Sequence, residues 1–445
     1  MPEHTAVPHR TNLADATTTT VPRRWRRLAV LAPTVLTDNS ETSVLSTLFA
    51  SIRQTLGLSL GSLGVLQATS RIVGVICGPL WVGLAGRLGR KRVLVASGIW
   101  MALATAACAA AQNYVQLLLL FALASVGAAA GQPVIHDIIA DLFDENSRGR
   151  AVGWLYGGVT LAGSLITPLI ARIAGAPGGW RTGFLILAAL MLGAALLALF
   201  RYEEPGSGAG DGLLSKAVPP VPRLDRGTVA ALFRSRTFTL MVVQRLMSGH
   251  LLAGTFAVVF LVDTYGFTTA TAALVAVPSG IGYFLGTVVG GILNDRVHRA
   301  HPWHGRVTLL QLAQFLYAGA AFAGTQIHWG SIGVFAALFG LMAFFQGLNP
   351  GINRPLVMAV TLPELRGPAF AVLISVAEAA AYAVFALGAG ALGDVIGLQA
   401  VFLWVLTILM IFNGVFCGLL HLTYPSDVRA VRTDIARRNT ALTAP

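Results

Sequence analysis

Charged residues are scarce in this sequence. Asp, Glu, Lys and Arg together make up 11% of its 445 residues, whereas hydrophobic residues make up 55%. A soluble domain carries roughly a quarter charged residues. The shortage excludes an ordinary soluble domain and predicts a protein that crosses a membrane several times.

Cysteine is also scarce, and the sequence patterns of common enzymes are missing. Cys77, Cys108 and Cys417 lie inside apolar runs, without the spacing of metal ligands or of an extracellular disulfide framework. We interpret them as packing residues. The sequence has no phosphate-binding loop, zinc-ligand spacing or nucleophile elbow. We therefore expect no enzyme activity, no cofactor, no metal and no use of ATP.

Basic residues exceed acidic ones, 31 to 19. Such an excess also occurs in nucleic-acid-binding proteins, but here the basic residues lie mainly in tails and in loops between apolar runs. Short loops rich in Arg and Lys prefer the cytoplasmic side. With the N-terminus inside, only Arg53, Arg172 and Arg181 fall in outer loops. This pattern predicts cytoplasmic termini, and we expect a bacterial inner (plasma) membrane.

Apolar runs long enough to span a bilayer, about 20 residues each, predict twelve helices. Their ranges are 28–52, 58–84, 93–113, 115–139, 150–173, 182–201, 238–262, 270–293, 307–328, 330–358, 367–392 and 398–421. A polar stretch with several prolines separates the sixth helix from the seventh. The predicted order is a cytoplasmic N-tail (1–27), a six-helix bundle (28–201), a cytoplasmic linker (202–237), a second six-helix bundle (238–421) and a cytoplasmic C-tail (422–445).

One short segment between two apolar runs is unusually basic. Residues 84–92 read Leu-Ala-Gly-Arg-Leu-Gly-Arg-Lys-Arg, and charges this dense cannot lie in hydrocarbon. A second copy, Leu293-Asn-Asp295-Arg296, follows 209 residues after Leu84-Ala-Gly-Arg87. This pairing indicates a duplicated membrane protein.

A second pair of segments supports the duplication. Arg148-Gly-Arg-Ala-Val matches Arg366-Gly-Pro-Ala-Phe at a shift of 218, and Phe184 matches Phe402 at the same shift. Parallel six-helix repeats place a binding site between the halves, near the middle of the membrane.

The two basic loops resemble a motif of the major facilitator superfamily, Gly-x-Leu-Ala-Asp-Arg-x-Gly-Arg-Lys-x-x-Leu. The first copy matches at Leu84, Ala85, Arg87, Gly89, Arg90, Lys91 and Leu94. It departs at Val82 and at Gly86, which removes the carboxylate of the family's latch to a neighbouring helix. The second copy matches at Gly291, Leu293, Asp295 and Arg296, with His298 in place of the later Gly.

The resemblance covers essentially the whole chain and implies an all-α polytopic membrane protein with two pseudo-symmetric six-helix bundles. It also implies gating roles for the loop residues. These are Arg87, Gly89, Arg90, Lys91, Asp295, Arg296 and, in the 4–5 loop, Arg148. Gly179-Trp180-Arg181-x-x-Phe184 resembles the start of the family's sixth helix.

The first two helices are similar to those of bacterial Spinster-like members of the superfamily. The similar segments are Asp38-Asn-Ser-Glu41 in the first helix and Gly64-Val-Leu-Gln67, Arg71 and Gly78-Pro79 in the second. This subfamily resemblance implies a lysophospholipid or sphingolipid-like cargo.

Ionisable residues inside spans are costly and are therefore functional candidates. Asp38 and Glu41 lie three residues apart on one helix face, so we expect one of the two to hold a proton. Arg71 either pairs with one of these carboxylates, which would only tie two helices together, or binds an anionic group such as a phosphate. The two roles alternate if substrate competes for the arginine.

Further candidates lie in both halves. Glu378 is a second proton-site candidate, with an ion pair to Arg245 or Arg354 as the alternative. The 218 shift sets His136 opposite Arg354, and His136 serves either as a titrating group or as a gate contact. The full predicted set for proton coupling is Asp38, Glu41, Glu378 and Asp137, and for substrate binding it is Arg71, Arg245, Arg354, His136, Asn39 and Asn353.

Two helices have composition that suggests bending or close packing. Asn349-Pro350-Gly351 and Asn353 predict a break in the tenth helix, because proline removes a helical hydrogen bond. Small residues at Gly153, Gly157, Gly158 and Gly163 predict close packing of the fifth helix.

Together these observations predict a proton-coupled secondary active transporter that moves an amphiphilic substrate, specifically a lysophospholipid, by alternating access. A drug/proton antiporter that exports lipophilic compounds is the alternative within the same fold, and a small organic-anion symporter comes third. An alternative of another class is a lipid-binding membrane sensor that transports nothing. We expect protons, membrane lipids and a small amphiphile as partners, no nucleic acid, and a monomer.

Overall fold

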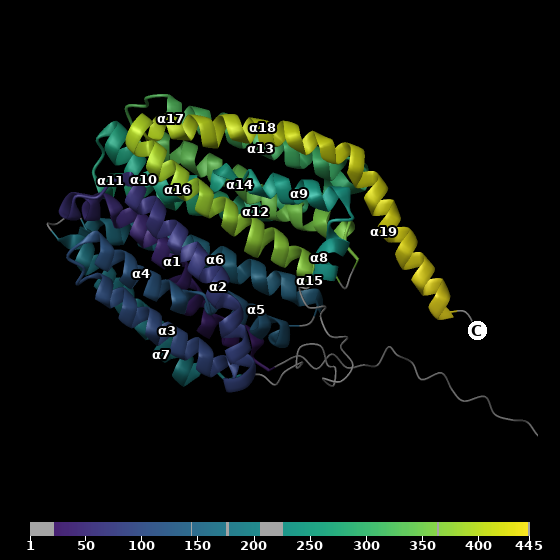
Figure 1. Ribbon diagram of the computed structural model, residues 1–445, viewed down its shortest axis with the longest axis horizontal. Helices are drawn as coiled ribbons and strands as arrows, with labels where there is room; N and C mark the ends of the chain where they lie inside the picture. Colours follow the sequence, from purple (N-terminus) through teal and green to yellow (C-terminus); the bar gives the residue numbers. More distant parts are fainter. Residues whose placement is uncertain (1–21, 144, 175–177, 205–225, 363–364, 444–445) are drawn as a thin grey trace, which may run out of the picture.

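The computed structural model describes residues 22–143, 145–174, 178–204, 226–362 and 365–443. These residues form long helices and turns and contain no β-strand. The helices lie side by side in two halves, α1 to α7 and α9 to α19 (Figure 1). The all-α fold predicted from the apolar runs is confirmed.

The N-terminal half contains seven helical segments. They are α1 (Arg24–Leu56), α2 (Leu60–Leu88), α3 (Arg90–Cys108), α4 (Tyr114–Ala128), α5 (Gly131–Leu142), α6 (Glu145–Ala174) and α7 (Gly179–Arg201). The short α8 (Arg226–Leu232) precedes the second half. Residues 1–21 of the predicted N-tail and 205–225 of the predicted linker lie outside the described residues.

The C-terminal half contains more breaks. Its first segments are α9 (Arg236–Leu246), η2 (Gly249–Leu251), α10 (Leu252–Tyr265), α11 (Thr269–Ala272), η3 (Ala273–Val275), α12 (Ala276–Ala300), α13 (Gly305–Gln326) and α14 (Ile332–Ala359). Then follow α15 (Arg366–Phe370), the π-helix η5 (Ala371–Glu378), α16 (Ala379–Ile396), α17 (Leu398–Phe402), the π-helix η6 (Leu403–Ile408), α18 (Leu409–Phe416), η7 (Cys417–Leu419) and α19 (Leu420–Thr443).

Ten helices of the described residues are long and apolar enough to cross a membrane, judged by length and composition. The predicted spans 28–52 and 115–139 are not among these ten. The first corresponds to α1, which has the length but carries Asp38 and Glu41. The second is divided into α4 and α5, because Pro133 has no backbone N–H to bond the Ala129 carbonyl.

Two further predicted helices have different limits in the structure. The predicted helix 238–262 breaks after Leu246 and resumes at Gly249. The Asn413 side chain donates to the carbonyls of Gln244 and Met247 at this break, at 3.3 and 3.1 Å. The last helix does not end near residue 421 but continues to Thr443, and α19 projects beyond the other helices (Figure 1).

The tenth predicted helix is not broken, contrary to the expectation from Pro350. α14 runs without interruption from Ile332 to Ala359. Pro350 cannot bond the Gln346 carbonyl four residues earlier, but the Asn349 side chain donates to that oxygen at 3.1 Å. The side chain thus replaces the hydrogen bond that proline removes, and the helix continues.

Tight turns mark one end of the bundle, which we call the Gly57 end. Gly57, Gly178, Gly266 and Gly397 lie in these turns, and all have positive φ, a conformation that favours glycine. Gly57 and Gly266 have closely similar left-handed geometry, with φ of 64° and 70°. The opposite end carries the loop at Gly89 and is called the Gly89 end.

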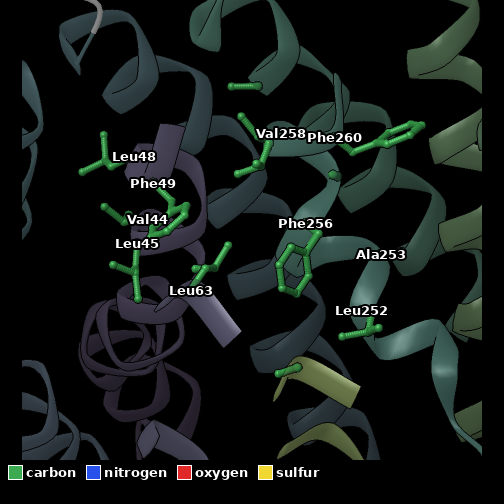
Figure 2. Close-up of a cluster of buried hydrophobic side chains, with 14 of the residues drawn as sticks. Val44, Leu45, Leu48, Phe49, Leu63, Leu252, Ala253, Phe256, Val258 and Phe260 are labelled. Atoms are coloured by element: carbon green, nitrogen blue, oxygen red, sulfur yellow. The ribbon is translucent and has the colours of Figure 1, made fainter. Parts of the chain in front are cut away.

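The hydrophobic core is shared at the Gly57 end and divided at the Gly89 end. One buried cluster joins α1 and α2 to α10 across the two halves, and Figure 2 shows Phe49 and Leu63 in the same close-up as Phe256. Toward the Gly89 end, Leu31 and Val93 belong to a cluster of the N-terminal half. Leu310 and Leu356 belong to a separate cluster of the C-terminal half.

The helices α2 and α16 bring the two halves into backbone contact near the Gly57 end. A Cβ added to Gly390 would lie 2.7 Å from the Leu60 carbonyl oxygen, and one added to Gly64 would collide with the Ala386 backbone. Asp394 of α16 accepts hydrogen bonds from the backbone N–H groups of Leu60 and Gly61, both at 2.8 Å. The α2 N-terminus is therefore capped by a residue of the other half.

Candidate functional site

The carboxyl pair predicted in the first helix lies near the middle of α1. Glu41 is only 1% exposed, and neither of its carboxyl oxygens has a hydrogen-bond partner within the described protein. Asp38 lies on the same face and within electrostatic range of Glu41. Burial of a charged carboxylate without a partner is strongly unfavourable, so this pair is a site of unusual electrostatic cost.

A glycine on the neighbouring helix makes room for Asp38. A Cβ added to Gly131, the first residue of α5, would collide with the Asp38 carboxylate. The break between α4 and α5 thus places a residue without a side chain against the carboxyl. Gly131 was not among the residues predicted from the sequence, because a contact over such a separation leaves no local pattern.

Arg71 does not pair with Asp38 or Glu41, which removes one of the two alternatives for its role in this conformation. Its guanidinium carbon instead lies 4.4 Å from the ring centroid of Tyr382 on α16. Among the described residues Arg71 has no ion pair, and it is exposed. The other alternative, an anionic ligand, therefore stays a prediction.

Tyr382 links the halves through a buried polar network that sequence reasoning missed. Its hydroxyl donates to Gln67 Oε1 on α2 at 3.0 Å and lies 2.7 Å from Thr255 Oγ1 on α10. Gln67 in turn donates to the Thr42 carbonyl and to Ser46 Oγ of α1. One tyrosine thereby joins α16 and α10 to α2 and α1.

His136 and Arg354, matched by the internal repeat, face the same tyrosine. His136 Nδ1 lies 3.3 Å from the Tyr156 hydroxyl, and the two rings stack. Tyr156 also lies within electrostatic range of Asp38 and Arg354. This tyrosine of α6 therefore lies between charges of both halves, while its hydroxyl contacts His136.

The acidic candidate of the C-terminal half is paired. Arg245 Nε donates to Glu378 Oε2 at 3.0 Å, and its Nη2 donates to the same oxygen. Glu378 is the last residue of the π-helix η5, a local widening that often occurs at functional sites. The structure thus supplies the ion pair that was the alternative to a free proton site, while Arg354 lies nearby, within range of Tyr283.

The loop motif at the Gly89 end makes a charge contact despite its missing aspartate. Arg90 Nε donates to Glu204 Oε1 at 3.1 Å, just after α7, and Arg27 contacts Glu203 at 3.4 Å. Arg87 is exposed and Lys91 half-buried. In the second copy Asp295 accepts from the Asn294 side chain at 3.1 Å, and Arg296 is exposed.

Several predicted residues cannot be placed in this site or have no contact in it. The side chains of Asn39, Asp137 and Arg148 are not among those that the structure describes. Asn353 is buried, and its Oδ1 has no partner within the described residues. The described residues contain no group of three or more His, Cys, Asp or Glu that could hold a metal.

One family model matches about two thirds of the chain. The family model of the Major Facilitator Superfamily matches residues 32–331. The Multidrug resistance protein MdtG of Citrobacter koseri is 36% identical over 143 residues, 32% of this chain and 34% of that protein. The chain therefore spans about a third of the length of that relative.

A longer match and two solved structures extend the likeness. The Probable 4-methylmuconolactone transporter of Cupriavidus pinatubonensis is 26% identical over 322 residues. The match covers 68% of this chain and 72% of that protein. An inward-facing, unoccupied bacterial homologue of the human lysosomal transporter Spinster has a TM-score of 0.72 at 18% identity, covering 93% of this chain and 98% of its own. The nucleoside transporter NupG has a TM-score of 0.68 at 15% identity, covering 90% and 99%.

Proposed function

This chain belongs to the Major Facilitator Superfamily and is a multi-pass membrane transporter, and from that premise we propose that it couples substrate movement to protons. The proposed substrate is an amphipathic molecule with a phosphate or zwitterionic head, specifically a lysophospholipid. Transport proceeds by alternating access between the two halves, with both termini in the cytoplasm.

The observation that carries the proton assignment is the unpaired carboxyl of Glu41 beside Asp38. Both lie near the middle of α1, and Glu41 is 1% exposed without a partner in the described protein. Two negative charges so close and so buried are unfavourable. One carboxyl therefore carries a proton when the site is closed to water and releases it when water enters.

Two cations support an anionic substrate head. Arg71 and Arg354 are both exposed, and neither forms an ion pair with a described residue. A guanidinium at membrane depth requires an anion or water to compensate its charge. A phosphate offers two oxygens to the guanidinium edge, and this bidentate match favours phosphate over a weakly polar head.

Coupling follows if the proton and the substrate head each compensate a charge at membrane depth. The head compensates Arg354 or Arg71, while the proton neutralises the Asp38–Glu41 pair. The conformations with and without these ligands then differ in their electrostatic cost, which is what shifts a two-state equilibrium. The shared core at the Gly57 end and the divided core at the Gly89 end support an inward-facing arrangement as one of the two states.

A drug/proton antiporter is the second candidate, favoured by the 36% identity to MdtG over 143 residues. In that case the Asp38–Glu41 pair receives a lipophilic cation in place of a proton. The two candidates differ in their need for Arg71 and Arg354, because a cationic drug gains nothing from a guanidinium.

Purified protein in liposomes with an imposed pH gradient tests the proposal. Movement of fluorescent lysophosphatidylethanolamine is compared for wild type, Glu41→Gln, Asp38→Asn and Arg354→Gln, with Glu203→Gln as the matched control at an exposed glutamate. We expect gradient-driven movement to be lost in the first three variants and kept in the control.

The opposite result is equally specific. If wild type moves no lysolipid, but takes up a lipophilic cation in a manner that needs Glu41 and tolerates Arg354→Gln, the lysolipid proposal is wrong and the antiporter stands.

A further inference from the structure

We propose that a hollow at the Gly89 end of the C-terminal half binds the headgroup of an anionic phospholipid from the surrounding membrane. The hollow, about 390 Å³ in volume, lies where α12 ends, the loop 301–304 turns and α13 begins. Its position is separate from the Asp38–Glu41 pair and from the proposed transport path. The proposal is therefore independent of the substrate.

The hollow lies where two membrane-capable helices, α12 and α13, are joined. Its lining combines apolar residues with polar ones, namely Val297, Ala300, His301, Pro302, Trp303, His304, Gly305, Thr308, Leu309 and Leu312. Leu312 and Leu316 are 49% and 40% exposed, one turn apart on α13. Exposed leucines on a spanning helix face hydrocarbon, so an acyl chain has an apolar path that begins at the hollow.

Two arginines of α19 lie beside Trp303, a residue that lines the hollow. The guanidinium carbons of Arg429 and Arg432, one turn apart on α19, each lie 5.6 Å from the ring centroid of Trp303. Trp303 is 38% exposed, as expected for a tryptophan at headgroup level. Arg429 Nε donates to the Pro425 carbonyl at 3.0 Å, so its two terminal guanidinium nitrogens are the ones that a phosphate would contact.

The loop and α19 are held together by an independent contact. His304 Nδ1 lies 3.2 Å from His421 Nδ1, and His421 Nε2 lies 2.8 Å from Gln311 Oε1. The Gln311 amide is oriented by its own donation to the Gly414 carbonyl at 3.0 Å. Trp303 and the two arginines are therefore positioned before any lipid arrives, which lowers the entropic cost of binding.

Charge complementarity selects the occupant. A phosphodiester with a net negative charge pairs with two guanidinium groups, whereas a zwitterionic head brings its own cation into the same place. A basic cluster beside a membrane attracts anionic lipid, and the apolar groove distinguishes a lipid from a free phosphate ion.

The test measures thermal unfolding of the full chain in detergent by circular dichroism, with added phosphatidylglycerol, phosphatidylcholine or inorganic phosphate. A ligand that binds the folded state raises its unfolding midpoint. We expect phosphatidylglycerol to raise the midpoint of wild type clearly more than phosphatidylcholine does. The double variant Arg429→Gln/Arg432→Gln should lose that extra shift, with an affinity roughly tenfold weaker.

Arg437→Gln is the matched control, because Arg437 is an exposed arginine on the same helix and should keep the full shift. If the double variant does not fold, Arg432→Gln alone gives the same test with a smaller loss. Equal protection by both lipids, an unchanged shift in the arginine variants, or equal protection by inorganic phosphate would each overturn the proposal. Loss of lysolipid transport has no bearing on this readout.

Discussion

Both halves carry carboxylates and an arginine near the middle of their helices, but only the C-terminal half joins them in an ion pair among the described residues. In the C-terminal half the Glu378 carboxylate meets Arg245 in a direct ion pair. In the N-terminal half Glu41 and Asp38 form no ion pair with any residue that the structure describes, and Asp38 lies against the backbone of Gly131. Arg71, which has the charge to pair with them, lies over the Tyr382 ring instead.

The difference separates a structural charge from a responsive one. An ion pair in a poorly hydrated place is costly to break because each partner is left uncompensated. A carboxyl without a cation changes its charge by gaining or losing a proton, without breaking any contact. This is why we propose the N-terminal pair for proton coupling, whereas the C-terminal pair holds η5 against α9.

The largest expected effect comes from breaking the C-terminal pair. Arg245→Leu leaves Glu378 without its cation and should lower the free energy of unfolding by about 3 kcal/mol. The double variant Arg245→Leu/Glu378→Leu should recover most of that loss, as measured by a double-mutant cycle from denaturant unfolding in detergent. Glu41→Gln, which breaks no pair, should stay close to wild type, and an equal loss there would refute the comparison.

The second effect tests the space beside Asp38. Gly131→Ala places a methyl group against the Asp38 carboxylate and should cost about 1–3 kcal/mol through overpacking. The control is Gly158→Ala on α6, where nothing lies within 4 Å of an added Cβ. Adding Asp38→Ala to the Gly131 variant should restore stability. Failure of that rescue would mean that the carboxyl is not the group in contact.

The third effect concerns the network that joins the halves. Tyr382→Phe keeps the ring under Arg71 but removes the hydroxyl shared by Gln67 and Thr255, which should cost about 1–2 kcal/mol. Tyr265→Phe is a suitable control, because its hydroxyl makes only long contacts of 3.4 and 3.5 Å. Tyr382→Phe should lower the unfolding midpoint more than Tyr265→Phe does. Equal midpoints would mean that the Tyr382 hydroxyl does not stabilise the contact between the two halves.

The smallest effect belongs to an exposed pair at the Gly57 end, where Arg53 of α1 bonds Asp263 of α10. Its side chains are 33% and 37% exposed, so water and salt weaken the attraction. Asp263→Asn should cost below about 1 kcal/mol. The loss should shrink further in high salt, and a salt-independent loss would argue for a contact other than the ion pair.

The fold was largely predictable because each span carries its own hydrophobic signal. Apolar length alone located ten of the predicted spans. The irregular elements were not predictable in this way. Met247 and Ser248 interrupt a helix without Pro, and the π-helices η5 and η6 widen apolar segments that read as ordinary helix. The break after Ala128 follows from the backbone N–H that Pro133 lacks, and the apolar length of this segment does not reveal it.

The candidate site was predicted in its charges and, as one of two alternatives, in the Arg245–Glu378 ion pair, but not in its other contacts. Asp38, Glu41, Arg71 and Glu378 stand out because a charge in a span is rare. Tyr382, Tyr156 and Gly131 do not, because tyrosine and glycine are common in membrane helices. Which cation meets which carboxylate depends on helix packing between segments more than a hundred residues apart, and no local pattern records that choice.

The cap that Asp394 provides to α2 has a consequence for how motion is observed. Ser59 makes no side-chain cap bond of its own, so the amides of Leu60 and Gly61 depend on a carboxylate from the other half. Their hydrogens are shielded while the halves touch and exchange with solvent once they part. Deuterium uptake at two backbone positions would then report how often this end of the transporter opens, without any substrate, label or engineered probe.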